Sequence, residues 1–312
     1  MEDYPRTLAE FEALFPAESA CRDYLFRLRW PDGFRCPRCG HRKAWPVGRA
    51  LFECAGCGYQ TSVIAGTIFQ DTHKSLTLWF RAIWWVTSQK SGASALGLQR
   101  VLGLGGYQTA WAWLHKLRRA MVRPGRDRLT GRVEVDETYL GGVKPGKRGR
   151  GAAGKALIVV AAQEDGPGIG RIRMRRIPDA SAGSLQPFLV EAIASGSVVH
   201  TDGWDGYTGL DRRGYVHQVT VRKAGATQLL PRVHRVVALL KRWLLGTHQG
   251  AVSPAHLDYY LDEFTFRFNR RTSRYRGKLF FRLVQQAVAV EPIPYARMVK
   301  YSQGRKPRDR KI

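Results

Sequence analysis

The sequence predicts a multidomain chain of the α/β class (α+β multidomain), in which a small metal-binding region and several helices precede a mixed-sheet domain. Three observations support this fold class. Two close pairs of cysteines stand near the N-terminus, a basic linker containing Pro and Gly follows at residues 122–131, and short apolar strands then alternate with amphipathic helices. With 312 residues the chain is long enough for two or three domains with buried cores.

The charge balance indicates a polyanionic partner. The chain carries 51 Lys and Arg against 25 Asp and Glu, a formal net charge of +26. Because like charges repel in a compact protein, nucleic acid is the first candidate partner. A membrane surface competes, but no apolar run reaches the length of about 18 residues that a spanning helix needs. The acidic N-terminus lacks the features of a signal peptide, so a cytoplasmic, nucleoid-associated protein is expected.

Residues 1–33 are expected to form two short amphipathic helices. Apolar side chains recur there at helical spacing in two groups, Leu8, Phe11, Leu14 and Phe15, then Tyr24, Leu25, Leu28 and Trp30. Between the groups stands Cys21, which we interpret as a small buried hydrophobe and not as a reactive or metal-binding thiol.

A zinc ribbon is predicted for residues 34–70. Cys36 and Cys39 are separated by two residues, and after fourteen further residues Cys54 and Cys57 repeat the spacing. Each pair with its glycine, CPRCG and CAGCG, is typical of a tight turn whose thiolates point at one metal ion, and two such turns complete a tetrahedral Zn²⁺ site. Four thiolates leave no open coordination position, so we expect this zinc to be structural.

Residues 74–121 are interpreted as a DNA-binding region. A helix over 74–89 is followed by GASALGLQRVLG, a glycine-bearing turn and YQTAWAWLHKLRRAM. Two short helices joined in this way, the second one basic, are typical of a helix-turn-helix that places its second helix in a major groove. An ordinary helical hairpin has the same pattern. The polar side of the second helix carries His115 and the expected DNA contacts Gln108, Thr109, Lys116, Arg118 and Arg119.

The mixed-sheet domain opens with GRVEVDETYLGG. Val133 and Val135 alternate with polar neighbours, which predicts a strand that ends at Asp136 before a glycine turn. One carboxylate after a strand is commonly a turn former. The arrangement recurs in SGSVVHTDGWDG, where a short apolar strand precedes Asp202 and another glycine turn. Two carboxylates in matching settings favour a shared role.

The order of elements within the mixed-sheet domain, expected over 132–290, predicts its topology. A mobile basic loop at 143–155 follows the first strand, and the later elements are strands from 156 and 170, a helix over 181–194, strands at SVVHT and from 215, and a helix over 233–245. Three strands, a helix, two strands and a helix make the ribonuclease H-like order, in which the first and fourth strands are neighbours. We therefore expect Asp136 and Asp202 to lie within bridging distance of one metal site.

Strand-end aspartates in a basic protein with its own DNA-binding region point to phosphodiester chemistry. Paired divalent ions stabilise the attacking and leaving oxygens of such reactions, and Mg²⁺ prefers hard oxygen ligands. In LPRVHRVVALLKRWLLGTHQG, His234 and Lys241 are seven residues apart and share one helix face, with Arg242 beside the lysine. A basic amphipathic helix with an incidental His234 has the same spacing.

Several motifs occur together: CPRCG with CAGCG, TAWAWLHKLRRAM, VEVDETYLGG, HTDGWDGY, VHRVVALLKRWLLGTHQG and YLDEFTFRFNRR. Together they resemble bacterial insertion-sequence transposases with an N-terminal zinc ribbon and a DDE-type catalytic domain, over about residues 30–285. The resemblance implies Asp136 and Asp202 as the first two catalytic metal ligands. It maps the third ligand to His234, seven residues before Lys241, which would contact phosphate.

The resemblance also implies a function. The protein would bind terminal inverted repeats and target double-stranded DNA as a homo-oligomer, and would cleave and transfer DNA strands with two Mg²⁺ or Mn²⁺ ions. His234 stands where many members have glutamate, which favours Mn²⁺ because imidazole is a softer ligand; Glu263 is the alternative third ligand. A non-catalytic zinc-ribbon/helix-turn-helix regulator and a structure-selective nuclease are the competing hypotheses. Residues 291–312 are expected to form a basic tail.

Overall fold

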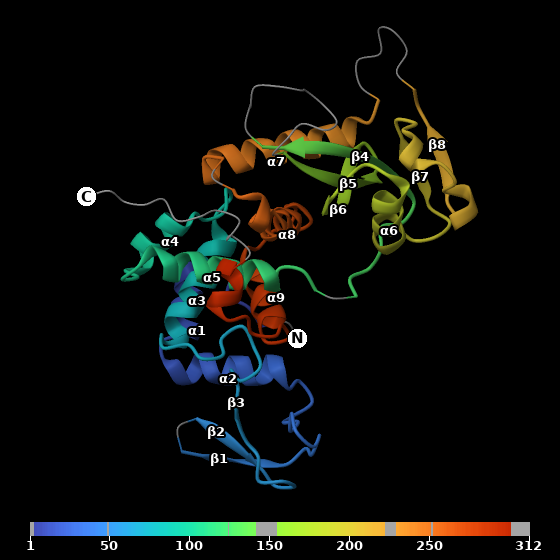
Figure 1. Ribbon diagram of the computed structural model, residues 1–312. Helices are drawn as coiled ribbons and strands as arrows, with labels where there is room; N and C mark the ends of the chain where they lie inside the picture. Colours follow the sequence, from blue (N-terminus) through green and yellow to red (C-terminus); the bar gives the residue numbers. More distant parts are fainter. Residues whose placement is uncertain are drawn as a thin grey trace. The chain divides into compact units, whose positions relative to one another are not determined.

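The computed structural model describes residues 3–48, 50–123, 125–141, 155–221, 229–250 and 252–300. The chain divides into two compact units, one of Met1–Arg123 with Ser273–Ile312, the other of Pro124–Thr272 (Figure 1). We expected the mixed-sheet domain to reach residue 290, but the chain joins the N-terminal unit again after Thr272. The basic loop expected at 143–155, up to residue 154, lies outside the described residues. Of the basic tail expected at 291–312, the part beyond residue 300 also lies outside them, while Tyr295–Lys300 forms a helix.

Helices with an aromatic core form most of the first unit. They are α1 (Leu8–Leu14), α2 (Glu18–Arg29), α3 (Leu76–Ser88), α4 (Ala95–Leu102), α5 (Tyr107–Ala120), α9 (Gly277–Ala287) and α10 (Tyr295–Lys300). The Phe15 ring centroid lies 4.8 Å from that of Phe80 and 5.6 Å from that of Phe280, so α9 shares a core with the N-terminal helices. At the start of α9 a side chain on Gly277 would collide with the Pro5 carbonyl, so only glycine permits this close approach.

The predicted helical pair is present as α4 and α5. The Ser94 hydroxyl accepts the Gly97 N–H at 3.0 Å and so caps α4, and Gly103 ends that helix in the left-handed conformation, with φ of 61°. The expectation that His115 and Arg118 lie on an exposed polar side of α5 is wrong, because the first is 0% exposed and the second 2% exposed. The helix packs against α9 and α10 as well as α4, so its C-terminal half is buried on several sides.

The zinc-ribbon region folds as a small antiparallel sheet in the order β1 (Ala44–Val47), β2 (Leu51–Cys54), β3 (Gln60–Ser62). Phe52 of β2 joins an aromatic cluster with α2, and its ring centroid lies 5.1 Å from that of Phe26. Arg29 of α2 donates to the carbonyls of Ser62 and Val63 at 2.9 and 2.8 Å. These contacts fasten the ribbon to the second helix.

The second unit contains the predicted mixed sheet, in the order β6-β5-β4-β7-β8. Its strands are β4 (Arg132–Leu140), β5 (Ala156–Asp165), β6 (Gly168–Ile177), β7 (Val198–Thr201) and β8 (Val216–Val219). The first three strands pair antiparallel, whereas β7 runs parallel to β4, and β8 parallel to β7. The first and fourth strands are therefore neighbours, which confirms the ribonuclease H-like order.

Helices cover both faces of this sheet. The helix α6 (Ala182–Ala192) packs on the face that carries Val133 and Val135, while α7 (Pro231–His248) and α8 (Leu257–Phe268) pack on the face that carries Ile158 and Val160. Because side chains alternate along a strand, Glu134 and Asp136 point to the α7 face. Short 3₁₀ turns lie at Asp205–Tyr207, Asp211–Arg213 and Pro254–His256.

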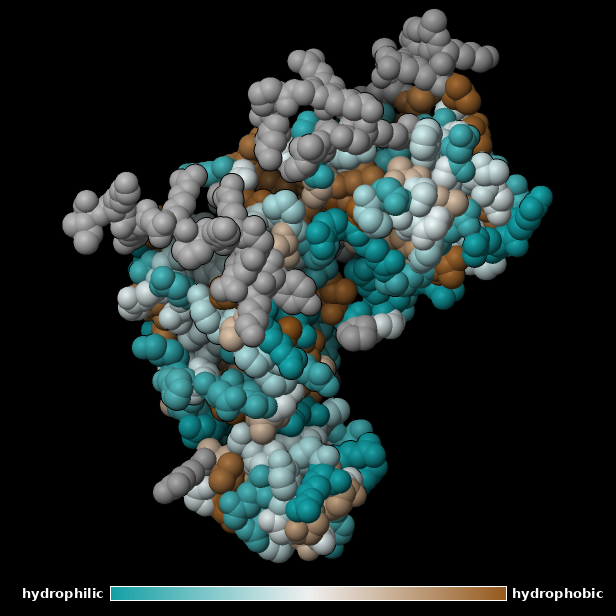
Figure 2. Space-filling model, in the orientation of Figure 1, coloured by the Kyte–Doolittle hydropathy of each residue, from teal (hydrophilic) through white to brown (hydrophobic). Residues whose placement is uncertain are grey.

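Hydrophilic side chains cover much of the face of the molecule shown in Figure 2, with apolar residues in smaller groups among them. Among the described residues, no helix has both the length and the hydropathy to cross a bilayer. The longest helix of the second unit, α7, has five Lys, Arg and His side chains in its middle and first turns, Arg232, His234, Arg235, Lys241 and Arg242.

Candidate functional site

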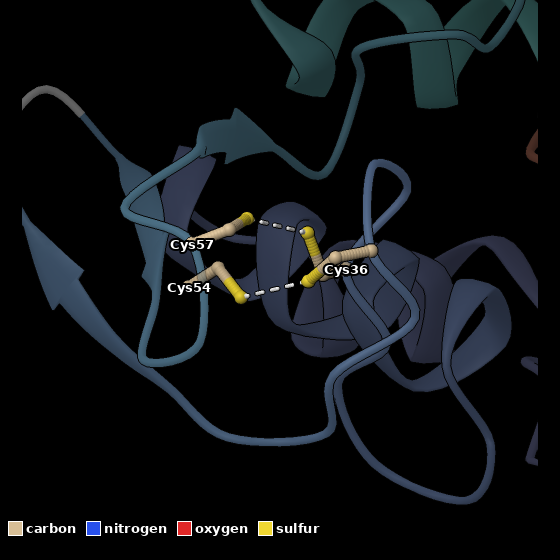
Figure 3. Close-up of side chains that lie close together, drawn as sticks. Cys36, Cys54 and Cys57 are labelled. Carbon is tan, nitrogen blue, oxygen red and sulfur yellow. Dashed lines mark hydrogen bonds between the residues drawn. The ribbon is translucent and has the colours of Figure 1, made fainter.

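Four cysteines converge in the zinc-ribbon region. Sγ of Cys36 lies 3.8 Å from Sγ of Cys57, and Sγ of Cys39 lies 3.6 Å from Sγ of Cys54 (Figure 3). All four sulfurs lie within 4.8 Å of one another. Thiolates in a tetrahedral site with Zn–S bonds of about 2.3 Å are about 3.8 Å apart, so the arrangement fits one Zn²⁺ ion.

Both cysteine turns have the same backbone geometry. Gly40 and Gly58 adopt φ values of 75° and 65°, and each donates its N–H to the carbonyl of the first cysteine of its pair, Cys36 or Cys54, at 2.9 Å. Desolvation raises the pKa of Cys36, but hydrogen bonds from neighbouring backbone N–H groups and thiols outweigh it and lower that pKa to about 6. For Cys39 a backbone hydrogen bond from His41 lowers the pKa, but hydrogen bonds with Cys57 and the other thiols outweigh it and raise that pKa to about 12. The metal-free cluster therefore retains protons, which a bound Zn²⁺ ion would displace.

Asp136 lies in the middle of a strand and not at a strand end as we expected. The strand β4 continues to Leu140 because its antiparallel pairing with β5 extends that far, although β7 pairs only with its first residues. In the parallel pairing of β4 with β7, the last paired residues are Glu134 and His200. Asp136 and Asp202 each follow two residues later, so they lie at the same level of the sheet. Asp202 directly follows β7, and its Oδ1 accepts the Trp204 N–H at 3.1 Å.

Negative charge accumulates around Asp136, whose side chain is 20% exposed. Burial raises the pKa of Asp136 to about 6, and the charges of Glu137 and Asp202 add to this effect, while the Glu137 N–H and His234 oppose it. A partly buried carboxylate beside other acidic groups is ionised at a cost, and a bound cation relieves that cost. The charge distribution therefore fits a divalent metal ion.

His234 stands beside Asp136. Its Nε2 lies 3.3 Å from Oδ2 of Asp136, and its side chain is 46% exposed. The alternative third ligand, Glu263, is 0% exposed on α8, and its Oε1 accepts the Arg267 Nε–H at 2.8 Å. The structure therefore brings His234 next to Asp136, while Glu263 is enclosed with an arginine.

Two carboxylates and an imidazole form a donor set suited to Mg²⁺ or Mn²⁺. Asp136 contacts His234, and the charge of Asp202 affects the pKa of Asp136. Within the described residues, the ligand atoms of the four cysteines all lie within 4.8 Å of one another, whereas those of Asp136, Asp202 and His234 do not.

The predicted cations of α7 are exposed. Lys241 lies two turns beyond His234 on the same face, about 10.5 Å along the helix axis. Arg242 is exposed next to it. The helix contains no Asp or Glu, so its exposed face is suited to a phosphate backbone.

The predicted DNA contacts of α5 divide into two groups. Gln108 is exposed and Thr109 is half-buried in the first turn, where a groove-binding helix makes its contacts. Arg118 is buried and so is not a surface contact. Lys116 is half-buried, and burial lowers its pKa against the opposing effect of Asp71. Arg119 is half-buried and donates to the Glu291 carbonyl at 3.1 Å.

Sequence reasoning missed two residues near the site. Glu134 is 1% exposed and binds the first turn of α7, which carries His234. Its place two residues before Asp136, on the same strand face, was the available indication. Tyr207 is 0% exposed and donates its hydroxyl to Oε2 of Glu137 at 2.9 Å. No spacing in the sequence indicated that contact.

Two family models match the chain. Residues 128–269 match the ISXO2-like transposase domain, and residues 16–60 match the transposase zinc-ribbon domain. The first match lies within the unit Pro124–Thr272 and includes Asp136, Asp202 and His234, while the second includes all four cysteines. No curated protein matches the chain.

Proposed function

Because the chain belongs to the insertion-sequence transposases, we propose that it cleaves DNA at the ends of its element and joins the freed strand to target DNA. The observation that carries this proposal is the 3.3 Å contact between Nε2 of His234 and Oδ2 of Asp136, at the point where β4 runs level with Asp202. Asp202 adds to the raised pKa of Asp136, which supports a second carboxylate beside this pair.

In the proposed reaction, water attacks a phosphodiester at the element's end, the bond to the 3′ oxygen breaks, and a 3′-hydroxyl is released. That hydroxyl attacks a target phosphodiester, and one phosphorus–oxygen bond forms as another breaks, so no ATP is needed. Asp136, Asp202 and His234 would hold divalent ions, which when bound supply Lewis-acid stabilisation of the phosphate oxygens. Lys241 and Arg242 would contact the DNA backbone.

The zinc ribbon and the α4–α5 pair are proposed to recognise the terminal inverted repeats, with Gln108 and Thr109 in the groove. DNA is the partner implied by both matched domains. Assembly of several copies on paired ends is part of this proposal.

The decisive experiment incubates the purified protein with labelled element-end DNA and a target plasmid in Mn²⁺. Covalently joined product supports transposition. Nicking without joining favours the nuclease, and retarded but uncut DNA favours the regulator. Asp202→Asn should abolish joining, whereas Asp205→Asn, an exposed aspartate in the next turn, should retain it. Equal activity in both variants would exclude Asp202 from the reaction.

A further inference from the structure

The N-terminus of α7 is held by a carboxylate from the sheet. The helix begins at Pro231, and the preceding Leu230 offers no side-chain cap. Oε2 of Glu134 accepts the backbone N–H of Arg232 at 2.8 Å and that of Val233 at 3.0 Å. Since the first N–H groups of a helix have no partners within it, this strand residue, 98 positions before Arg232, takes the place of a local cap.

The side chain of Arg232 strengthens this attachment. Its Nη1 donates to Oε1 of Glu134 and to Oε1 of Glu164, both at 3.1 Å. Its Nε and Nη2 donate to the carbonyls of Gly168 and Gly166, both at 3.0 Å. One arginine therefore joins the first turn of α7 to β4 and to the turn between β5 and β6. The charge of the buried Glu134 is balanced within the same network.

The same helical turn carries the third proposed metal ligand. His234 follows Val233 directly, and its N–H makes a helical bond to the Leu230 carbonyl at 3.0 Å. Glu134 and Asp136 lie on one face of β4, about 7 Å apart along the strand. Adjacent residues of the helix thus meet alternate residues of the strand: Val233 meets Glu134, and His234 meets Asp136.

We propose that Glu134 is a positioning residue that sets the rotation of the first turn of α7 and so directs His234 toward Asp136. A helix turned by one residue, about 100°, would aim a different side chain at the site. Both oxygens of Glu134 are engaged by Arg232 and Val233, so Glu134 acts through the helix and does not bind the metal. The inference rests on the proposed function, in which Asp136 and His234 hold divalent ions.

The test measures Mn²⁺ binding by electron paramagnetic resonance, with full-length, zinc-loaded protein and no DNA. Glu134→Gln keeps the size of the side chain and removes its charge, and we expect Mn²⁺ binding to weaken by about tenfold or more, as for other groups that orient a metal ligand. The matched control is Glu164→Gln, which alters the same arginine without touching the backbone of α7. Equal weakening in the two variants would overturn the inference, because general charge balance would explain it.

A double-variant comparison separates positioning from a structural role. Once His234→Ala has removed the ligand, Glu134→Gln should weaken Mn²⁺ binding no further, because residues that act through one another are not additive. A full second loss in that background would contradict the inference. If Glu134→Gln does not fold, Glu134→Asp keeps the charge near Arg232 while withdrawing it from the helix. We expect Glu134→Asp to bind Mn²⁺ as weakly as we expect of Glu134→Gln. Binding as tight as in the wild type would contradict the inference.

Asp136→Asn distinguishes failure of the inference from failure of the proposed function. If Mn²⁺ binding is the same in Asp136→Asn as in wild type, the proposed metal site is wrong, and the role assigned to Glu134 falls with it. If binding requires Asp136 but is unchanged by Glu134→Gln, the metal site stands and only the positioning role is refuted.

Discussion

Asp136 is less stable as an anion in the folded protein than in the unfolded chain. Burial raises its pKa from 3.8 to about 6, assisted by Glu137 and Asp202. A raised carboxyl pKa means that the folded state binds the proton more tightly, so this group lowers the free energy of unfolding as the pH rises from about 4 to about 6. In the proposed metal site, the ionised Asp136 side chain therefore costs stability when no cation is bound.

Replacing that carboxylate should therefore stabilise the fold while removing activity. We expect Asp136→Asn to raise the free energy of unfolding at pH 7.5 by at most about 3 kcal/mol, since each pKa unit corresponds to about 1.4 kcal/mol. The gain should shrink as the pH falls through 6 and should be absent near pH 4. Urea unfolding of zinc-loaded protein without Mg²⁺ or Mn²⁺ measures it. A lower stability of Asp136→Asn at pH 7.5 would contradict the prediction.

The glycines around Asp202 also act at the scale of single residues. Gly203 has φ of 83°, and a Cβ added there would lie 2.7 Å from a methyl group of Val219. A Cβ on Gly206 would collide with the Ala180 carbonyl and lie 2.7 Å from Leu185 Cδ1. The motif HTDGWDGY therefore needs glycine for close packing as well as for turning, and that packing holds the chain next to Asp202 against the rest of the unit.

At the scale of elements, α5 combines an exposed first turn with a buried second half. Gln108 is exposed, whereas Arg118 is 2% exposed and Trp113 is stacked on Trp79, with ring centroids 3.8 Å apart. The proposed DNA contacts and the buried packing of the first unit therefore involve different residues of one helix.

Substitutions along α5 should separate these two roles. Gln108→Ala should weaken binding to element-end DNA, by about 1–3 kcal/mol if it reads a base, and leave the melting temperature unchanged. Arg118→Ala should lower the melting temperature of the first unit, because it empties a buried site and disturbs the groups around it. Differential scanning calorimetry and fluorescence anisotropy measure the two effects. Weakened DNA binding by Arg118→Ala at unchanged melting temperature would show that Arg118 reaches DNA directly.

The zinc ribbon is an element whose fold we expect to depend on its metal. Its sheet has three strands of four residues or fewer, so it buries little apolar surface of its own. Cys36→Ser should reduce bound zinc from about one equivalent to well below one, and the loss of ligation should unfold the ribbon. Cys21→Ser is the matched control, since Cys21 is buried at 0% exposure in α2 and should leave the zinc content unchanged. Elemental analysis measures the zinc content of the two variants, and circular dichroism measures the loss of folded structure. One full equivalent of zinc in Cys36→Ser would exclude the four-cysteine site.

At the scale of the whole molecule, we expect the excess of positive charge to govern association with DNA. The net charge of +26 is carried partly by helices without acidic residues, such as α7. A protein of this charge attracts duplex DNA of any sequence and releases counterions as it binds.

DNA affinity should therefore depend steeply on salt. If six to ten phosphates are neutralised, affinity for a random duplex should fall by about 10³- to 10⁵-fold between 50 and 200 mM salt. Fluorescence anisotropy titrations at several salt concentrations measure the slope. A decrease of less than about tenfold would mean that few of these cations contact phosphate.

Local spacing was enough to predict several parts of this protein. The two cysteine pairs predict the ribbon because a ligand pair and its glycine define a turn by themselves, and the four sulfurs do converge. The order of strands and helices predicts the sheet because few topologies accommodate that order, and β4 does pair with β7. The seven-residue spacing of His234 and Lys241 places both on one helix face for the same local reason.

Tertiary contacts decided the rest. The strand of Asp136 is long because β5 pairs with it as far as Leu140, Arg118 is buried because other helices surround α5, and α9 returns to the first unit through its aromatic contacts. The cap that Glu134 provides for α7 joins residues 98 positions apart. Hydrophobic periodicity describes which face of an element is apolar, but it does not say which distant element will cover that face or supply its missing hydrogen bonds. The neighbours of Asp136 therefore became known only from the folded chain.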